Sequence, residues 1–419
     1  MPLSHARTEV ETTDRQRVEQ LIRRIADECP QRKPTSRDEH RAQVILRAQL
    51  RRLHGVATWH RFRFNRNLYV VLALHFGLAT LAACLFFVSP LWAAALHLLI
   101  AVSYTADSNR YGYWLRSLLP KGTASNLVVT FAARSALRRR VVVTAHADAA
   151  PTGWIFQQWF SGLGSVEKAP KILRTLARPL LIAVVGLVAV AAIEIHAWST
   201  AKSLPQFPLA FYGFSFYFVV LTVLNLQIIW KNKTVAGAND NLSGCAALTV
   251  LAQRLTLDQP DDVEYVFVVT ACEEAGTGGA WALARELRGT WEADKTDIVV
   301  LDSIGGGELC LFQEGEMIPW RIPAHLLQAA RSAAADDERF AKLFLFPLPA
   351  GATDALPFLA QNFAALGVGR IDRRIGTPLH YHLPSDTPDT LNYEQVVETI
   401  DYVELLAHRL VSASSAHVT

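Results

Sequence analysis

The sequence has 419 residues, of which 51% are hydrophobic and only 19% are charged, and its mean hydropathy is +0.18. This length suits one large domain or two to three ordinary ones, and the composition is more apolar than that of an ordinary soluble enzyme, so we expect part of the chain to lie in lipid. The net charge of +3 comes without a basic run interleaved with aromatic residues, which argues against nucleic acid as a partner.

The cysteines and the N-terminal segment argue against a disulfide-rich protein, a thiolate zinc protein and a secreted protein with a cleaved signal peptide. Five cysteines are scattered along the chain without a CxxC pair, which predicts neither a disulfide framework nor a thiolate zinc site. Residues 1–16 are polar and lack an apolar core, so we expect no cleaved signal peptide. Residues 15–28 and about 41–53 carry apolar side chains at helical spacing and are predicted to form two amphipathic helices.

Two pairs of apolar segments interrupt the rest of the chain. Residues 68–88 are nearly uncharged and long enough to cross a hydrocarbon core ~30 Å thick, and residues 91–104 continue the apolar run after a Ser-Pro break. Residues 180–198 and 211–230 form a second pair around a loop with two prolines. Each pair is predicted to form a transmembrane hairpin.

Several ionisable residues lie within these apolar segments. We interpret Glu194 and His196 as interfacial, because they lie near the polar end of a predicted helix. His75 and His97 are expected to be buried interior histidines, and no function is assigned to them.

The remaining sequence alternates strand and helix patterns, which predicts a mainly parallel sheet. The predicted strands are 126–131, 140–144, 265–270, 297–301 and 364–370. The predicted helices are 245–255, 280–288, 322–335 and 393–410.

Metal-competent side chains follow the predicted strands. Glu273 and Glu274 come after the strand 265–270, and glycines follow them. Ligands of open α/β sheets bind beyond the carboxyl ends of the strands, and two adjacent carboxylates there repel each other unless a cation is present. Taken alone, this pair would be interpreted as a solvated acidic turn.

Other candidate metal ligands are expected at the ends of other strands and in one polar loop. We expect strand ends to present three further sets, namely His146 with Asp148, Asp240, and Asp302, while a polar loop adds His382. Two imidazoles and several carboxylates suit zinc, with cobalt or manganese as alternatives. Two metals ~3.5–4 Å apart need a bridging carboxylate, which Asp supplies well.

The ordered set of motifs is more specific than any single one. It consists of HADA at 146, GANDNLSGCA at 237, ACEEAGTGGAWALARE at 271, LDSIGG at 301, and ATDALPF with YHLPSDTPDTL near the end. On these motifs the sequence resembles the co-catalytic di-zinc exopeptidase family, which includes bacterial leucyl aminopeptidases, glutamate carboxypeptidase-like enzymes, the transferrin receptor ectodomain and glutaminyl cyclases. The N-terminal helices and the break PQRKPTSRDEHRA also resemble the family's opening.

The resemblance implies an α/β fold with a mixed, mainly parallel central sheet flanked by helices, here with four inserted transmembrane helices in two hairpins. It also implies two divalent metal ions, most simply Zn²⁺. His146 and Asp302 would bind the first ion, Glu274 and His382 would bind the second, and Asp240 would bridge the two.

The resemblance assigns the proton chemistry to neighbouring residues. Asp148 would orient His146, since a carboxylate behind a metal-binding histidine fixes its tautomer. Glu273 would be the general base that takes a proton from a metal-activated water and passes it to the leaving amine. Asp354 matches a position that we interpret as structural.

The predicted division of the chain follows from the two insertions. Residues 1–67 are the N-terminal helices of the peptidase domain, 68–105 the first hairpin, 106–178 the sheet part with His146, 179–230 the second hairpin, and 231–419 the remaining ligand and catalytic part. Basic residues near the spans on the domain's side include Arg63, Arg66, Lys121, Lys168, Lys171 and Arg174, whereas the other side has only Lys202. The positive-inside rule then places the peptidase domain in the cytoplasm.

We therefore expect a membrane-embedded zinc aminopeptidase whose partners are a peptide substrate and membrane lipid. One alternative is a glutaminyl cyclase-like acyltransferase with a single zinc, and another is a non-enzymatic membrane scaffold or transporter. The complete ligand set favours the aminopeptidase. The side-chain preference, a carboxypeptidase or dipeptidase specificity, the metal used in vivo and the oligomeric state stay open.

Overall fold

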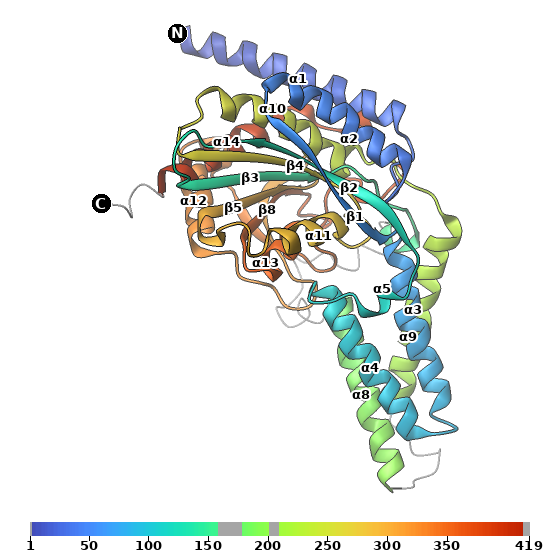
Figure 1. Cartoon of the computed structure of the whole chain (residues 1–419). Helices are drawn as coiled ribbons and strands as arrows, with labels where there is room; N and C mark the ends of the chain where they lie inside the picture. Colours follow the sequence, from blue (N-terminus) through green and yellow to red (C-terminus); the bar gives the residue numbers. More distant parts are fainter. Residues whose placement is uncertain (1, 158–177, 201–208, 414–419) are drawn as a thin grey trace.

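The computed structural model describes residues 2–157, 178–200 and 209–413, with no account of the side chains of residues 2–12 and 413 (Figure 1). An eight-stranded sheet forms its centre, in the order β1-β2-β4-β3-β5-β8-β6-β7. The strands are β1 (Val56–Asn65), β2 (Lys121–Phe131), β3 (Arg139–His146), β4 (Val263–Thr270), β5 (Thr296–Leu301), β6 (Glu308–Gln313), β7 (Phe344–Pro347) and β8 (Ala364–Ile371). The four central strands β4, β3, β5 and β8 are parallel, whereas β1, β2 and β6 join by antiparallel pairing. The predicted mixed, mainly parallel sheet is confirmed.

Helices cover both faces of the sheet, which explains why its central strands are continuous apolar runs. In β4, Tyr265, Phe267 and Val269 join one core cluster, while Val266 and Val268 join the cluster on the opposite face. The first face is covered by α1 (Pro2–Glu28), α2 (Arg37–Leu50), α10 (Gly244–Leu257), α12 (Ala324–Ala335) and α14 (Tyr393–Ala413). The second face is covered by α11 (Gly278–Leu287) and α13 (Ala355–Ala360).

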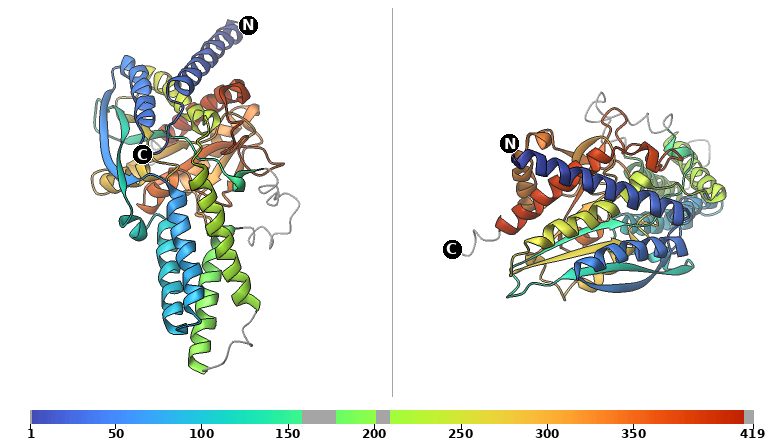
Figure 2. Two further views of the ribbon diagram at one scale, coloured as in Figure 1. Left: turned by 90° about the vertical axis from the view of Figure 1, so that its right-hand side faces the viewer. Right: turned by 90° about the horizontal axis from the view of Figure 1, so that it is seen from above.

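Four apolar helices form a bundle that projects away from the sheet (Figures 1 and 2). They are α3 (Leu68–Leu85), α4 (Pro90–Ser108), α8 (Pro179–Thr200) and α9 (Leu209–Lys231). Helix α3 packs against α9, and α4 packs against α8. Each of the four is long and apolar enough to cross a membrane.

One prediction about the ionisable residues of the bundle, the interfacial position of Glu194, differs from the structure. Glu194 is buried, and its Oε2 lies 2.9 Å from Nδ1 of His97 on α4, so the interfacial interpretation of Glu194 is wrong. The other ring nitrogen of His97 lies 3.0 Å from the carbonyl oxygen of Ala79. The pair thus joins the two hairpins, whereas His196 is exposed.

The bundle is attached at one end of the sheet. In the antiparallel register, Leu127 of β2 lies opposite Val269 near the carboxyl end of β4, so Lys121 at the start of β2 extends past that end. Asn65, the last residue of β1, pairs with Lys121 and lies just before α3. The root of the bundle therefore lies at the end of the sheet where the parallel strands have their carboxyl ends.

Candidate metal centre

Three adjacent parallel strands deliver candidate ligands to this edge. His146 ends β3, Glu273 and Glu274 follow β4, and Asp302 follows β5. Because β3 pairs in parallel with both β4 and β5, their carboxyl ends meet at the same edge. These positions agree with the sequence-based expectation.

Asp240 lies at the same edge of the sheet, but a turn and not a strand end positions it. It follows no strand, contrary to our expectation, but lies in the turn Ala238–Ser243 between α9 and α10, where its own backbone angles are not helical. Gly237 begins this turn with a φ of 60°, and a Cβ there would lie 2.6 Å from the carbonyl oxygen of Asp240. Asp386 accepts hydrogen bonds from the backbone N–H groups of Asn239 (2.6 Å) and Asp240 (3.1 Å), which fixes the turn.

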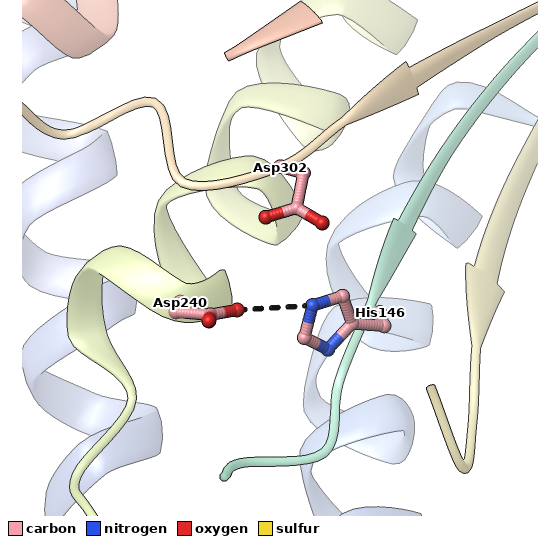
Figure 3. A group of neighbouring side chains, drawn as sticks. All are labelled: His146, Asp240 and Asp302. Carbon is pink, nitrogen blue, oxygen red and sulfur yellow. Dashed lines mark ion pairs between the residues drawn. The ribbon is translucent and has the colours of Figure 1, made fainter. Parts of the chain in front are cut away.

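The candidate ligands converge in overlapping groups of three. Possible ligand atoms lie within 4.8 Å of one another in three sets, namely His146–Asp240–Asp302, His146–Glu273–Glu274 and Asp240–Glu274–His382. Figure 3 shows His146, Asp240 and Asp302 pointing toward one another from three separate segments. All seven residues predicted for the site thus lie together, since Asp148 contacts both His146 and the backbone of the Glu pair.

Asp240 is shared between two of these groups. Its Oδ1 lies 3.1 Å from Nε2 of His146, and its Oδ2 lies 3.4 Å from Nε2 of His382. The same Nε2 of His382 lies 3.4 Å from Oε2 of Glu274. The two oxygens of one carboxylate therefore face two different histidines, which is the arrangement that a bridging ligand requires.

The donor set fits divalent cations. Oε1 of Glu274 is buried and has no hydrogen-bond partner within the described part of the chain, and Nε2 of His146 makes no well-aligned hydrogen bond there although Oδ1 of Asp240 lies 3.1 Å away. Buried polar atoms normally have partners, and a set of imidazole and carboxylate donors suits zinc. A cation between these side chains would satisfy both atoms.

The electrostatics of the cluster support the same conclusion. Burial, followed by the charges of neighbouring carboxylates, raises the pKa of Glu274 well above its usual range, and burial likewise dominates the raised pKa of Glu273. Burial and the charge of Asp240 raise the pKa of Asp302 to about 7. Burial also opposes the ionisation of Asp240, but its contacts with His146 and His382 outweigh that effect and lower its pKa. The protein therefore concentrates carboxylates where only added positive charge allows all of them to ionise.

Asp148 organises the two glutamates as well as His146. It is fully buried, and its two oxygens accept hydrogen bonds from the backbone N–H groups of Glu273 (3.1 Å) and Glu274 (2.9 Å). Its Oδ1 also lies 3.5 Å from Nδ1 of His146. One carboxylate thus ties the end of β3 to the segment after β4.

Sequence reasoning missed two further residues that hold these loops. Glu39 of α2 accepts hydrogen bonds from the backbone N–H groups of Cys272 (2.7 Å) and Thr35 (2.8 Å). Arg32 is fully buried and donates to the carbonyl oxygens of Ala147 (3.0 Å), Ala236 (2.7 Å), Gly237 (3.1 Å) and Cys29 (3.2 Å). The polar break between α1 and α2 therefore holds the loops that carry His146 and Asp240.

Aromatic residues form a wall beside His382, and the root of the bundle contributes to it. The ring of Phe156 lies 4.4 Å from that of His382, 6.0 Å from that of Tyr381 and 6.2 Å from that of Tyr69, centroid to centroid. Tyr69 is the second residue of α3 and lies within electrostatic range of Glu273, Glu274 and Asp240. One of the four apolar helices thus begins at the edge of the candidate metal centre.

The comparisons with known proteins agree with this fold. Residues 224–407, somewhat less than half of the chain, match the sequence model of Peptidase family M28. This region contains Asp240, Glu273, Glu274, Asp302 and His382 but not His146 or Asp148. No curated protein matches the sequence significantly.

Solved structures resemble nearly the whole chain. The zinc aminopeptidase BSAP from Bacillus subtilis aligns with a TM-score of 0.55 and 13% identity over 94% of both chains. The aminopeptidase from Aneurinibacillus sp. strain AM-1 aligns with a TM-score of 0.55 and 13% identity over 94% of this chain and 93% of its own. A glutaminyl cyclase from Bacteroides thetaiotaomicron aligns with a TM-score of 0.53 and 12% identity over 94% and 96%. At these identities the likeness shows a shared fold.

Proposed function

We propose that this chain is a zinc-dependent exopeptidase that removes N-terminal residues from peptides, held in a membrane by its four apolar helices. The match of residues 224–407 to Peptidase family M28 and the shared fold with zinc aminopeptidases support this proposal. The observation that carries it is Asp240, whose two oxygens face two separate ligand groups.

The proposal assigns five residues to two metal ions. His146, Asp302 and one oxygen of Asp240 would hold one ion, while Glu274, His382 and the other oxygen of Asp240 would hold the second. When bound, divalent ions in such a pair lower the pKa of a water molecule and polarise the scissile carbonyl group.

Glu273 is proposed as the proton carrier. It neighbours Glu274 in sequence, but its Oε2 lies 4.0 Å from Nε2 of His146, and it belongs to neither of the groups that contain Asp240. A carboxylate beside the ligand groups that is not shared between them suits a general base. It would take a proton from the attacking water and donate it to the leaving amine. Asp148 would keep both glutamates in place through their backbone N–H groups.

The aromatic wall supports a role in substrate binding. Tyr69, Phe156 and Tyr381 lie on the side of the centre where the bundle begins, and such rings pack well against an apolar side chain. A peptide whose first residue is apolar would therefore be bound beside the metals. The free α-amine of this residue is needed for turnover in the proposed reaction.

The membrane placement rests on the four apolar helices and on the charges beside them. Arg63, Arg66 and Lys121 lie close to the bundle root on the domain's side, which supports a cytoplasmic location for the domain. Lys168, Lys171, Arg174 and Lys202, which also entered the sequence-based argument, lie outside the described residues. The proposed domain division is a peptidase domain interrupted by two hairpins. Cysteine-accessibility labelling tests the sidedness, and a cytoplasmic residue 202 or an external residue 121 would overturn it.

A second candidate is a glutaminyl cyclase-like reaction at one zinc ion, which the structural likeness to glutaminyl cyclases favours. The deciding experiment combines metal analysis of the purified full chain with a substrate panel. The aminopeptidase proposal expects hydrolysis of unblocked aminoacyl amides, no turnover of N-acetylated ones, loss of activity with chelators and recovery with zinc or cobalt. Cyclisation of N-terminal glutamine with one metal per chain would favour the second candidate instead.

A further inference from the structure

A basic cavity lies beside the root of the bundle, separate from the metal centre. Its volume is about 530 Å³, and its walls come from β1, the start of β2, the segment after α4 and helix α11. The short helix α5 (Trp114–Ser117) forms one side of it. The cavity therefore lies where the soluble domain meets the apolar helices.

The charge of this cavity is strongly positive. The described lining contains no carboxylate. It contains five basic side chains, which are Arg63, Arg116, Lys121, Arg285 and Arg288. The charge of Arg116 is neutralised, because it is buried and donates two hydrogen bonds to Asp107 at 2.6 and 2.9 Å. The other four side chains are exposed and form no ion pair within the described part of the chain. Four cationic side chains without ion-pair partners around one cavity favour binding of an anionic group that contacts several of them at once.

The floor of the cavity is aromatic and rigidly packed. Phe64, Tyr113 and Trp281 pack in edge-on and tilted arrangements with ring centroids 4.6 to 6.3 Å apart, and the guanidinium group of Arg285 lies 4.6 Å above the ring of Trp281. Tyr113 donates a hydrogen bond to the carbonyl oxygen of Gly276 at 2.9 Å. The cavity is therefore held in shape by packing and not only by its charged rim.

Exposed apolar and aromatic side chains surround the cavity on the bundle's side. Tyr111 is 67% exposed, Trp114 is 56% exposed and Leu118 is 80% exposed. Tyrosine and tryptophan at such a position are typical of the membrane–water interface, and basic pockets beside membrane helices bind lipid headgroups. The position, the charge and the exposed side chains together favour a membrane lipid over a soluble ligand.

We propose that this cavity binds the headgroup of an anionic phospholipid, with its phosphate among Arg63, Lys121, Arg285 and Arg288. The inference rests on the proposed membrane placement and goes beyond the proposed peptidase reaction. It gives the enzyme domain a fixed contact with the membrane surface in addition to its hairpins.

The test uses the purified full chain in detergent, with native mass spectrometry to count retained lipids. Phosphatidylglycerol and phosphatidylcholine with identical acyl chains are the probes, and inorganic phosphate is tested separately by thermal shift. The cavity variant is Arg285→Gln with Arg288→Gln, and the matched control is Arg61→Gln with Arg66→Gln, which removes two exposed cations from near α3 but outside the cavity. Circular dichroism and monodispersity verify that both variants fold.

The expected result is selective retention of phosphatidylglycerol by the wild type and the control. A basic side chain near an anionic lipid contributes about 5-fold in affinity, so the cavity variant should bind roughly 30-fold more weakly. Equal retention of both lipids, equal loss in both variants, or binding of inorganic phosphate without phosphatidylglycerol would overturn the proposal. The readout needs no substrate, so a protein without peptidase activity can still pass or fail it.

Discussion

Replacement of Asp148 by asparagine tests how the metal centre is held together. Asp148 is fully buried and uses both oxygens to accept the backbone N–H groups of Glu273 and Glu274. Asparagine has nearly the same shape, but its amide NH₂ cannot accept, so one of these hydrogen bonds becomes a contact between two donors. A hydrogen bond to a charged group contributes ~1.5–3 kcal/mol. This free energy corresponds to about 10- to 100-fold in an equilibrium constant, the usual range for residues behind metal ligands.

The assay is competition for zinc against a calibrated chelator, together with thermal unfolding of the metal-free protein. We expect Asp148→Asn to bind zinc about 10- to 100-fold more weakly and to lose stability. The matched control is Asp297→Asn, because Asp297 is equally buried on β5 but lies at the opposite end of the strand from Asp302, next to His325 (2.8 Å). This control should lose stability and keep its zinc affinity. Unchanged zinc affinity in Asp148→Asn would refute the positioning role.

Three further predictions concern other parts of the molecule. Glu273→Gln should keep both metals and lose at least ~10²-fold in turnover, the usual scale for a general base. Glu274→Gln should instead lose metal, and added zinc should partly restore its activity. Metal content and single-turnover rates of both variants measure these effects. The pKa of Asp302 is raised from 3.8 to about 7, so the folded metal-free protein binds a proton at this residue more tightly than the unfolded chain does. The stability of the metal-free protein should therefore fall as the pH rises toward and through about 7. Thermal unfolding with and without zinc measures this dependence. Glu194→Gln should weaken the helix bundle by about 1 kcal/mol in detergent unfolding, while the exposed His196→Gln has no effect.

Each of these predictions has a contrary outcome. Metal loss in Glu273→Gln with a loaded but inactive Glu274→Gln would mean that the roles are swapped. A metal-free protein that gains stability between about pH 5 and about pH 7 would contradict the raised pKa of Asp302. Identical unfolding of Glu194→Gln and the wild type would mean that the contact with His97 does not stabilise the bundle.

The central strands were predictable because helices cover both of their faces. This burial selects the continuous apolar runs of β3, β4 and β5, whose ends carry His146, Glu273 and Asp302. The edge strand β1 was missed, although its side chains alternate between apolar and basic in Arg61, Phe62 and Arg63, a signal of a half-buried strand. The short strands β6 and β7 were also missed, because their few residues lie between loops and carry no periodic pattern long enough to interpret.

The candidate ligands and the positioning residue Asp148 were predictable from motifs, but the other residues that hold these loops were not. Asp386, Glu39 and Arg32 act through backbone groups far away in sequence, as in the contact between Glu39 and the N–H of Cys272. The only local signal was Ser36 three residues before Glu39, a helix-capping pattern. The contact between Glu194 and His97 was equally hidden, since it joins separate hairpins and depends on how these pack.

The central claim is that two metal ions share Asp240, and metal content per chain tests it most directly. Elemental analysis of the purified full chain, saturated with zinc and freed of excess, should give two zinc ions per chain. Asp240→Asn should lose at least one of them, together with the hydrolysis of unblocked aminoacyl substrates. One zinc ion per chain in the wild type, unchanged in Asp240→Asn, would contradict the account.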